Sequence, residues 1–458
     1  MSDLEAVLDR IDADLDQAIE RLFATLRLKS ISTDPAYAAA TRACAEWHAA
    51  DLASIGFEAS VRDTAGHPMV VGHDRAAAGT SLLFYGHYDV QPVDPLELWE
   101  HDPFEPRIVT RADGSKMIVA RGASDDKGQL MTFVEACRAW KAVTGALPLP
   151  MTILLEGEEE SGGENLPPFL DANIEELRAD LALICDTSMW DARTPAITTS
   201  LRGLCGEEII IRGADRDLHS GFYGSAAANP NHVLARILAD LRDGEGRVTL
   251  PGFYDGVPDL PEALRASWAK LDFDPDAFLG EVGLAQPAGE KGRSVLEQTW
   301  SRPTAEVNGM GGGYQGEGFK TVIPAQASAK ISFRLVFDQD PHKIRAAFRD
   351  FVKARIPSDC SVEFIEHGSG TAVAFDTDAP AFQKTQAALT DEWGRDAAFV
   401  GGGGSIPVTT LLKERLGIDV VMVGFGLTDD RIHSPNEKYD LQSFHKGIRS
   451  WARILAAL

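Results

Sequence analysis

The sequence predicts an α/β protein in which a mostly parallel central sheet, flanked by helices, is interrupted by an inserted α+β domain. Near both ends of the chain, continuous apolar runs alternate with helical patterns, which is typical of parallel strands buried on both faces. The middle of the chain has strands with more apolar-polar alternation and longer loops. Because 458 residues exceed the usual size of a single core, more than one domain is expected.

The first expected element is a helix at the N-terminus. Apolar residues recur at helical spacing from Leu4 to Leu26. Ser2 and Glu5 have the spacing of a capping box, which marks the start of a helix. We therefore expect one long amphipathic helix over this segment.

The remaining elements of the α/β domain follow in order along the chain. The first part is expected to contain strand 81–90, helix 128–143, strand 151–160, a helix near 172–179 and strand 180–188. The last part is expected to contain helix 409–417, strand 419–426 and a closing helix at 443–458. The strands are continuous apolar runs, which favours a sheet covered by helices on both faces.

The inserted domain extends from about residue 205 to about residue 374. Its expected strands are 207–213, 329–337 and 361–367, and its expected helices are 231–243 and 341–356. We therefore assign residues 1–204 and 375–458 to the α/β domain. Residues 205–374 form the insertion that splits it.

The chain carries a strong negative charge. Its 44 Lys and Arg residues face 69 Asp and Glu residues, a formal net charge of −25. A field of that sign repels nucleic acids and anionic membranes, so we expect neither as a partner. The sequence lacks a signal-peptide pattern and any apolar run near the ~20 residues that span a bilayer, which predicts a cytoplasmic protein. The five cysteines form no C-x-x-C motif, which favours buried, reduced thiols.

One short stretch, LLEGEEESGG (154–163), contains glutamates at positions 156, 158, 159 and 160. Such crowding of like charges raises carboxylate pKa values and lowers stability unless a cation lies among them. An acidic run is usually a solvated turn, and Glu156 and Glu158 are consistent with that simpler interpretation. The stretch by itself therefore does not indicate a cation site, and its interpretation depends on residues in other segments.

Candidate metal ligands follow each apolar strand of the α/β domain. They are His87 and Asp89, Glu159 and Glu160, Asp186, and His433 in the loop after the last strand. Because the binding crevice of an open α/β sheet lies beyond the carboxyl ends of its strands, these groups are expected to converge. Asp125 and Asp126 in RGASDDKG enlarge the set. Imidazole nitrogen mixed with carboxylate oxygen suits Zn²⁺, with Mn²⁺ or Co²⁺ as alternatives.

Other chemistries fit the sequence poorly. It contains no Walker loop, no G-x-S-x-G nucleophile elbow and no H-E-x-x-H motif. A cysteine nucleophile at Cys185 stays open, although its strand context suggests burial. Isolated histidines such as His48, His67, His101 and His232 are more typical of surface or satisfied core positions.

Several motifs together resemble one family of enzymes. They are FYGHYDVQP, RGASDDKG, EGEEESG, ICDTS, DLHSGFYG, TVIP, GGGGSIP and RIHSPNEK. From about residue 80 onward, these motifs and their order resemble those of the two-metal hydrolases. That family includes carboxypeptidase G, acetylornithine deacetylase, aminoacylase and the cytosolic and carnosine dipeptidases. GHYDVQPVDPLELWEHDPFEP and DLHSGFYG look most like the dipeptidase branch.

The resemblance implies a role for each residue at the strand ends. It implies that Asp125 bridges two metal ions, that His87 and Asp186 complete one site, and that Glu160 and His433 complete the other. Asp89 resembles the carboxylate that orients the metal-bound imidazole, and Glu159 the general base. Adjacent strand residues point opposite ways, so Glu159 and Glu160 can share a site only if the chain bends there.

The resemblance also implies that the insertion is a lid and dimerisation domain. His219 matches a histidine that crosses the dimer to stabilise the oxyanion, although a surface-loop histidine beside Asp217 is the alternative. Arg334 matches a clamp for a substrate carboxylate, and an arginine paired with a local acid is nearly as consistent. Asn308 and Ser405 are further candidates for substrate contacts.

These inferences predict a homodimeric two-metal hydrolase that cleaves dipeptides or small peptides with a free C-terminal carboxylate. In this hypothesis a metal-bridging water is activated by Glu159. An N-acyl-amino-acid amidohydrolase with the same centre is the alternative within enzymes. A catalytically silent, metal-stabilised binding module is the alternative from another class, and a complete ligand set with Glu159 beside it argues against silence.

Overall fold

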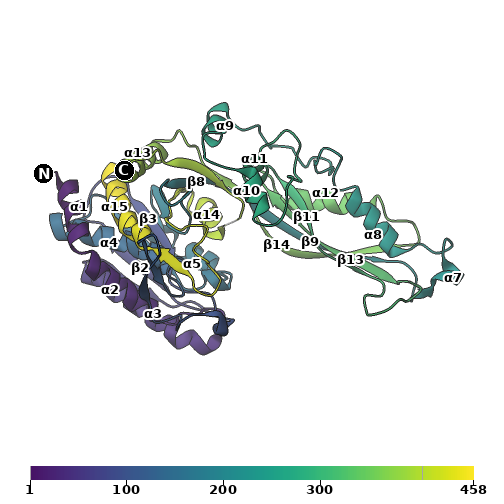
Figure 1. The fold of residues 1–458 in the computed structure, drawn as a ribbon, viewed down its shortest axis with the longest axis horizontal. Helices are drawn as coiled ribbons and strands as arrows, with labels where there is room; N and C mark the ends of the chain where they lie inside the picture. The colour runs from purple at the N-terminus through teal and green to yellow at the C-terminus, as the bar shows by residue number, and fades with distance from the viewer. Residues whose placement is uncertain (1, 405) are drawn as a thin grey trace. The chain divides into compact units, whose positions relative to one another are not determined.

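The computed structural model of the chain describes residues 2–404 and 406–458. Within these residues the chain forms two compact units (Figure 1). The first comprises the chain up to Thr199 together with Phe375–Val400 and Leu411–Leu458. The second comprises Ser200–Ala374 and the described residues of Gly401–Thr410, a segment that our division by sequence assigned to the α/β domain.

The sheet of the first unit is mostly parallel at its centre, as predicted. Its strand order is β1 (Glu58–Arg62), β2 (Met69–Asp74), β6 (Met151–Glu156), β3 (Leu82–His87), β7 (Leu181–Ile184), β17 (Asp419–Met422) and β8 (Ala196–Leu201). The central strands β6, β3, β7 and β17 run parallel, whereas β1, β2 and β8 pair antiparallel. The carboxyl ends of the four central strands therefore lie along one edge of the sheet.

Helices cover the sheet and bury its apolar side chains (Figure 1). They include α3 (Ala38–Ser54), α4 (Lys127–Thr144), α13 (Pro380–Trp393) and α15 (Leu441–Ala457). The ring of Phe84 on β3 stacks on Phe133 of α4 with centroids 3.7 Å apart, and Trp451 of α15 meets Phe133 edge-on. Among residues 2–404 and 406–458, none of the helices combines the length and apolarity that crossing a membrane requires.

The N-terminal segment forms two helices, so the prediction of one long helix was wrong. Helix α1 (Asp3–Ala13) ends before Asp14, whose φ of −100° and ψ of 6° depart from helical geometry, and α2 (Leu15–Leu26) follows. Helix α1 packs on α4 and α15, whereas α2 packs on α3 and α4. Both helices contact α4, and the break at Asp14 allows α1 to turn its apolar face also toward α15 and α2 to turn its own toward α3.

Two other predicted helices differ from expectation in form. The one near 172–179 is only α6 (Ile174–Leu177), which follows the separate helix α5 (Leu166–Ala172). The one at 409–417 begins as α14 (Pro407–Leu411) and continues as a π-helical turn, Leu412–Leu416. The sequence pattern located these segments, while their exact form depends on what they pack against.

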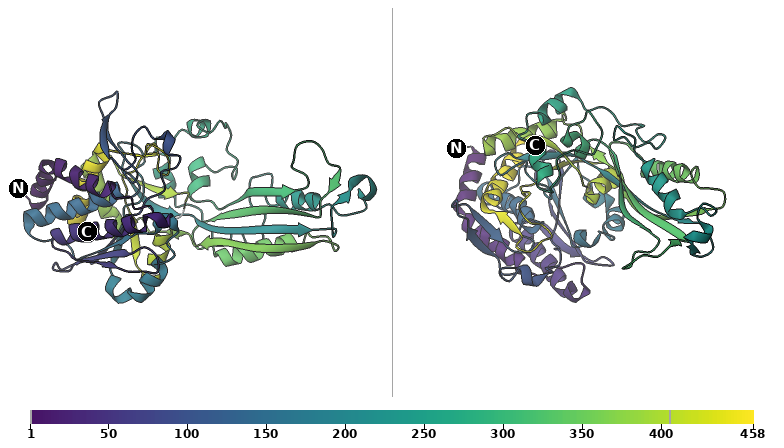
Figure 2. Two further views of the ribbon diagram at one scale, coloured as in Figure 1. Left: turned by 90° about the horizontal axis from the view of Figure 1, so that it is seen from below. Right: turned by 45° about the vertical axis from the view of Figure 1, so that its right-hand side comes forward.

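The second unit is an antiparallel sheet with helices on one face (Figure 2). Its strand order is β11 (Thr304–Gly312), β13 (Gln326–Leu335), β9 (Gly203–Arg212) and β14 (Ser361–Gly370). Alternate residues of β9 and β13, such as Ile209, Ile331 and Phe333, are buried against α8 (Pro230–Ala239) and α12 (Pro341–Lys353). The alternation in these strands therefore reflects one covered face.

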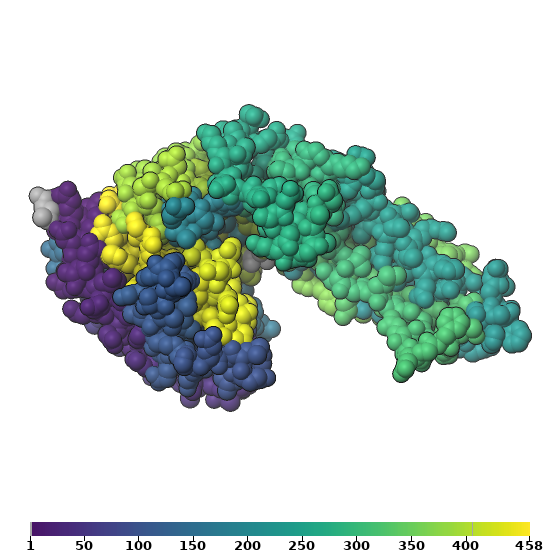
Figure 3. Space-filling model, viewed as in Figure 1, coloured from purple at the N-terminus to yellow at the C-terminus, as the bar shows by residue number. Residues whose placement is uncertain are grey.

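A small sheet ties the C-terminal segment to the first half of the chain. It has the order β18 (Lys438–Asp440), β5 (Lys116–Val119), β4 (Arg107–Thr110). Next to it, Asn436 accepts a hydrogen bond from the Glu100 amide and donates to the Leu98 carbonyl, both at 2.9 Å. Figure 3 shows segments near residue 100 and near the C-terminus side by side on the surface of the first unit. This pairing fixes the far end of the loop that carries His433.

Candidate metal centre

Five predicted ligands come together in the first unit, beyond the carboxyl ends of the parallel strands. His87 ends β3, Asp186 follows β7, and Glu160 lies in a 3-10 helix, Glu159–Ser161, after β6. Asp125 lies in the loop entering α4, and His433 lies between β17 and β18. Among the described residues, the groups His87–Asp125–Asp186 and Asp125–Glu160–His433 each keep one potential ligand atom per residue within 4.8 Å.

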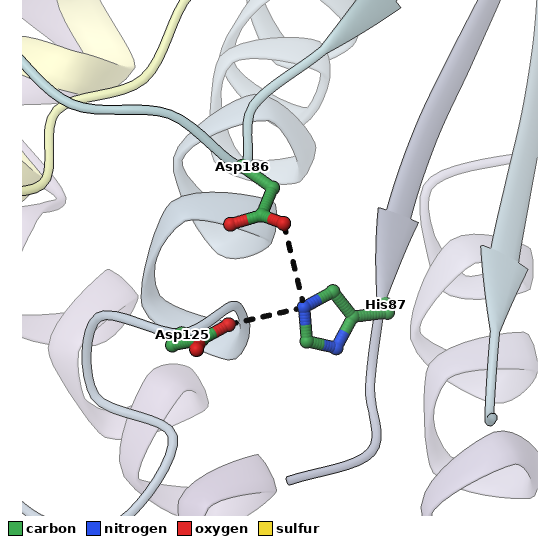
Figure 4. Close-up of side chains that lie close together, drawn as sticks. All are labelled: His87, Asp125 and Asp186. Atoms are coloured by element: carbon green, nitrogen blue, oxygen red, sulfur yellow. Dashed lines mark hydrogen bonds and ion pairs between the residues drawn. The ribbon is translucent and has the colours of Figure 1, made fainter. Parts of the chain in front are cut away.

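Asp125 is shared by both groups. Its Oδ1 lies 3.1 Å from His87 Nε2, and its Oδ2 lies 2.9 Å from His433 Nε2. His87 Nε2 also faces Asp186 Oδ2 at 3.9 Å, as Figure 4 shows, and His433 Nε2 faces Glu160 Oε2 at 3.1 Å. The two oxygens of one carboxylate therefore serve two separate groups, each with one histidine and one further carboxylate.

The negative charges of this cluster favour the binding of cations. The hydrogen bonds to Asp125 and Glu160 raise the pKa of His433 to about 10. Burial, together with the negative charge of Asp125, raises the pKa of Asp186 well above its ordinary value. Each imidazole presents Nε2 to two carboxylates, an arrangement that is stable only with a proton or a metal ion between them. The mixture of imidazole nitrogen and carboxylate oxygen therefore fits divalent metal ions such as Zn²⁺.

The orientation of His87 is set from behind by Asp89. His87 Nδ1 lies 3.2 Å from the Asp89 carbonyl oxygen and 3.4 Å from Asp89 Oδ1. Asp89 Oδ2 in turn accepts hydrogen bonds from Ser32 Oγ at 2.6 Å and from the Glu160 amide at 3.0 Å. Donation from Nδ1 to Asp89 leaves the lone pair of Nε2 free to face the cluster. Asp89 is fully buried, so water does not compete for this contact.

Glu159 lies beside the cluster, but its carboxylate forms no hydrogen bond with the described residues of the cluster. The bend that its position requires is the 3-10 helix Glu159–Ser161, followed by Gly162 and Gly163 with φ of 102° and 61°. The carboxylate of Glu159 makes no hydrogen bond with another described side chain or amide. Burial raises its pKa above the ordinary value, and the charges of Glu160 and Asp89 act in the same direction. A carboxylate in this position is able to accept a proton.

The other two glutamates of the stretch are buried, so their interpretation as a solvated turn was wrong. Glu156 ends β6, and its Oε2 accepts a hydrogen bond from Tyr85 Oη at 2.5 Å. Burial raises the pKa of Glu156 to about 8, which favours its protonated form. Glu158 accepts hydrogen bonds from the His67 amide and from Asn165 Nδ2. Partners distant in sequence therefore account for both.

Asp126, included among the possible ligands by sequence, lies outside both ligand groups. Its carboxylate accepts hydrogen bonds from the His87 amide at 3.1 Å and from Cys185 Sγ at 3.4 Å. Burial raises its pKa to about 7. Cys185 is itself fully buried, as its strand context suggested, and its thiol faces a carboxylate that disfavours the thiolate.

Sequence reasoning missed Glu437, which holds the loop that presents Asp125. Its Oε1 accepts hydrogen bonds from the amides of Ser124 and Asp125 at 2.9 and 3.0 Å. Its Oε2 accepts from the Gly122 amide at 2.9 Å and from Arg121 Nη1 at 2.6 Å. Glu437 is fully buried and lies four residues after His433. One loop therefore supplies a candidate ligand and fixes the loop that supplies another.

Three further predicted residues lie on strands of the second unit. His219 ends β10 (Leu218–His219) and is exposed. Its Nδ1 accepts a hydrogen bond from the Gly221 amide at 3.0 Å. In the neutral imidazole the ring N–H is therefore at Nε2. Arg334 lies on the face of β13 away from the core, and no described carboxylate forms an ion pair with it. Asn308 is exposed at a β-bulge of β11. Ser405 lies outside the described residues.

Comparison with known proteins identifies the family. A model of peptidase family M20/M25/M40 matches residues 83–457. The chain belongs to this peptidase family. Cys-Gly metallodipeptidase dug1 of Schizosaccharomyces pombe is 29% identical to this M20/M25/M40 peptidase over 462 residues, covering 97% of this chain and 96% of the relative. The Beta-Ala-His dipeptidase of Homo sapiens is 28% identical over 382 residues, covering 81% and 73% of the two chains.

Solved structures agree with this assignment. The di-peptidase Dug1p of Saccharomyces cerevisiae matches the M20/M25/M40 peptidase described here with a TM-score of 0.77 and 27% identity over 99% of this chain and 98% of that one. The M20 family metallo-carboxypeptidase Sso-CP2 of Sulfolobus solfataricus matches with a TM-score of 0.81 and 30% identity over 96% and 98%. The predictions of an α/β metallopeptidase and of the dipeptidase branch are therefore confirmed.

Proposed function

We propose that this peptidase hydrolyses dipeptides at a centre in which Asp125 would help to hold each of two divalent metal ions. The observation that carries the proposal is the sharing of one carboxylate between two groups, each completed by a histidine and a second carboxylate. His87 and Asp186 would complete one metal site, and Glu160 and His433 the other. Mixed nitrogen and oxygen ligands favour Zn²⁺, with Mn²⁺ or Co²⁺ as alternatives.

In this proposal Glu159 is the general base. Bound divalent metal ions would supply a water of lowered pKa as the nucleophile. Glu159 would accept a proton from the attacking water and return it to the leaving amine. Support comes from its position next to Glu160, from the absence of a hydrogen bond to another described group, and from the raised pKa that burial gives it. Asp89 keeps the His87 imidazole in the tautomer that a metal site needs.

The proposed substrates are dipeptides with a free C-terminal carboxylate. Two relatives are named as dipeptidases, one for Cys-Gly and one for Beta-Ala-His, which supports this size of substrate. Arg334 would bind the carboxylate, because its planar guanidinium can donate two parallel hydrogen bonds and no described acid already pairs with it.

The proposal includes a homodimer in which His219 acts on the partner's substrate. The Nδ1 contact to Gly221 leaves an N–H at Nε2, and that N–H would donate to the oxyanion that forms during attack. Phe222, whose ring centroid lies 4.7 Å from that of His219, restricts the imidazole. Exposure of His219 is consistent with a group that acts across an interface.

A substrate screen with a matched inactive variant tests the proposal. Protein reconstituted with Zn²⁺, Mn²⁺ or Co²⁺ should hydrolyse dipeptides such as Cys-Gly in preference to N-acyl amino acids. Glu159→Gln should retain two metal ions per chain by elemental analysis and lose about 10²- to 10⁴-fold in kcat.

Two results would change the proposal. Loss of metal from Glu159→Gln would make Glu159 a ligand and reverse its assignment with Glu160. Preferential hydrolysis of N-acyl amino acids would assign the same centre to an amidohydrolase.

A further inference from the structure

A second arginine, Arg202, lies near Arg334 within the second unit. Arg202 immediately precedes β9. Arg334 of β13 pairs in register with Leu204 of β9, which is two residues after Arg202. Two strand residues span about 7 Å, which is within the reach of two arginine side chains. Burial, with a further contribution from the positive charge of Arg334, lowers the pKa of Arg202 to about 10. The two guanidinium groups therefore lie close enough to interact.

Arg202 is held in place by backbone carbonyls rather than by an acid. Its Nε donates to the Gly403 carbonyl at 3.0 Å, and its amide donates to the Gly404 carbonyl at 3.1 Å. These contacts leave the terminal Nη groups available, since Nε alone is used by Gly403. Within residues 2–404 and 406–458, no carboxylate forms an ion pair with Arg202 or with Arg334.

The nearest candidate counter-ion is already engaged. Among the described acids, Glu306 is the one whose charge favours the protonated form of Arg202, and burial and the charge of Arg334 outweigh it in lowering the Arg202 pKa. Glu306 Oε1 accepts a hydrogen bond from Arg242 Nη2 at 2.5 Å. Two half-buried guanidinium groups therefore lie together without a counter-ion among the described residues, and an anion would stabilise this arrangement.

We infer that Arg202 is a second substrate-binding residue and that it forms, with Arg334, a two-arginine clamp for the C-terminal carboxylate of the dipeptide. The inference rests on the proposed function, because it extends the role assigned there to Arg334. Anchoring of Nε on Gly403 presents the Nη atoms in a fixed direction, so little side-chain freedom is lost on binding. The clamp makes the free carboxylate, rather than the side chain beside it, the main recognition element.

Binding to an inactive protein tests the clamp without turnover. In zinc-loaded Glu159→Gln protein, calorimetry would compare glycylglycine with glycylglycine amide, which lacks the carboxylate. The free dipeptide should bind more tightly than the amide. Adding Arg202→Gln should weaken binding of the free dipeptide by about 10- to 100-fold, the usual effect of losing a charge-assisted hydrogen bond, and should change binding of the amide by less than about threefold.

Control variants separate the clamp from other causes. Arg212→Gln removes an exposed arginine of β9 that pairs with Glu363, and it should change neither affinity. Arg334→Gln should behave like Arg202→Gln. Equal weakening of dipeptide and amide by Arg202→Gln would overturn the inference, because it would indicate a structural role for the Gly403 contact.

The remaining outcomes separate this inference from the proposed function. If Arg334→Gln abolishes the preference for the free dipeptide and Arg202→Gln leaves it intact, the inference fails and the proposed function stands. If the Glu159→Gln protein binds dipeptide and amide equally, or binds neither, the carboxylate requirement of the proposed function fails and the inference fails with it.

Discussion

At the scale of single residues, the proposed metal centre depends on side chains that are not among its proposed ligands. Asp125 can face both His87 and His433 only if its loop is held, and Glu437 provides four of the contacts that hold it. Because all four donors point at a charged and fully buried carboxylate, a neutral group cannot replace it without leaving donors unsatisfied. Residues that support metal ligands in this way commonly change metal affinity by 10- to 100-fold.

We therefore expect Glu437→Gln to weaken metal binding. The amide retains the size of the side chain but replaces one acceptor oxygen with a donor, which faces backbone N–H groups. Zinc affinity, measured by competition with a chelating dye, should fall by about 10- to 100-fold.

The control is Glu392→Gln, which alters another buried glutamate of the first unit that pairs with Arg449 and Arg453. This change should lower stability and leave zinc affinity unchanged. Equal zinc affinity in Glu437→Gln and wild-type protein would contradict a positioning role.

At the scale of elements, α2 and α3 are joined by a contact that depends on pH. His48 of α3 is buried, and its Nε2 lies 3.0 Å from Thr25 Oγ1 of α2. Lys127, at the start of α4, donates to the Thr25 carbonyl at 2.9 Å and adds positive charge to the same region. Burial, followed by the charge of Lys127, lowers the pKa of His48 to about 3. The packing of these three helices therefore requires a neutral imidazole.

This contact predicts a loss of stability in acid. The unfolded chain binds a proton at His48 below a pKa of about 6.5, whereas the folded chain does not until about pH 3. The stabilisation is thus complete above pH 6.5 and is lost as the pH falls below it. Between pH 7 and pH 5 this group should lower the free energy of unfolding by about 2 kcal/mol.

Urea denaturation of wild-type protein and His48→Gln at both pH values measures this effect. The decrease in the free energy of unfolding from pH 7 to pH 5 should be smaller in the variant than in the wild-type protein by about 2 kcal/mol. An identical difference in both proteins would show that His48 is protonated without unfolding.

At the scale of the whole molecule, the residues with a proposed role belong to two units of the chain. The metal ligands and Glu159 belong to the first unit, whereas His219, Arg202 and Arg334 belong to the second. If His219 acts in trans, each site of a symmetric dimer needs both partners.

Mixed dimers test this arrangement. His219→Ala and Glu159→Ala dimers should each be nearly inactive, because one lacks the oxyanion donor and the other the base. In a mixed dimer, one site has an intact Glu159 and receives the intact His219 of its partner, while the other site lacks both. Random mixing should therefore restore about a quarter of wild-type activity.

The measurement is activity after subunit exchange, with exchange confirmed by mass spectrometry. The same protocol applied to wild-type protein and His219→Ala controls for losses during mixing. If activity does not recover although exchange is confirmed, His219 acts in the site of its own chain. That result would contradict the model in which His219 acts in trans.

The sequence alone determined the strands, their apolar continuity and the polar residues that follow them. These are local properties, and because parallel strands share one edge of the sheet, they predicted that His87, Asp186 and Glu160 would meet. The same interpretation placed His433 and Asp125 among the candidates, and the family resemblance implied which metal site each one serves. All five lie together in the structure, although their roles as ligands stay predictions.

Tertiary structure decided what depends on contacts between distant segments. The helix break at Asp14, the burial of Glu156 and the pairing of Arg202 with the Gly403 carbonyl have no signature in local periodicity. Glu437 contacts the amide of Asp125 across 312 residues of sequence. A local pattern carries no information about such a partner, because the free energy of burying a charged group depends on donors that only the folded chain brings together.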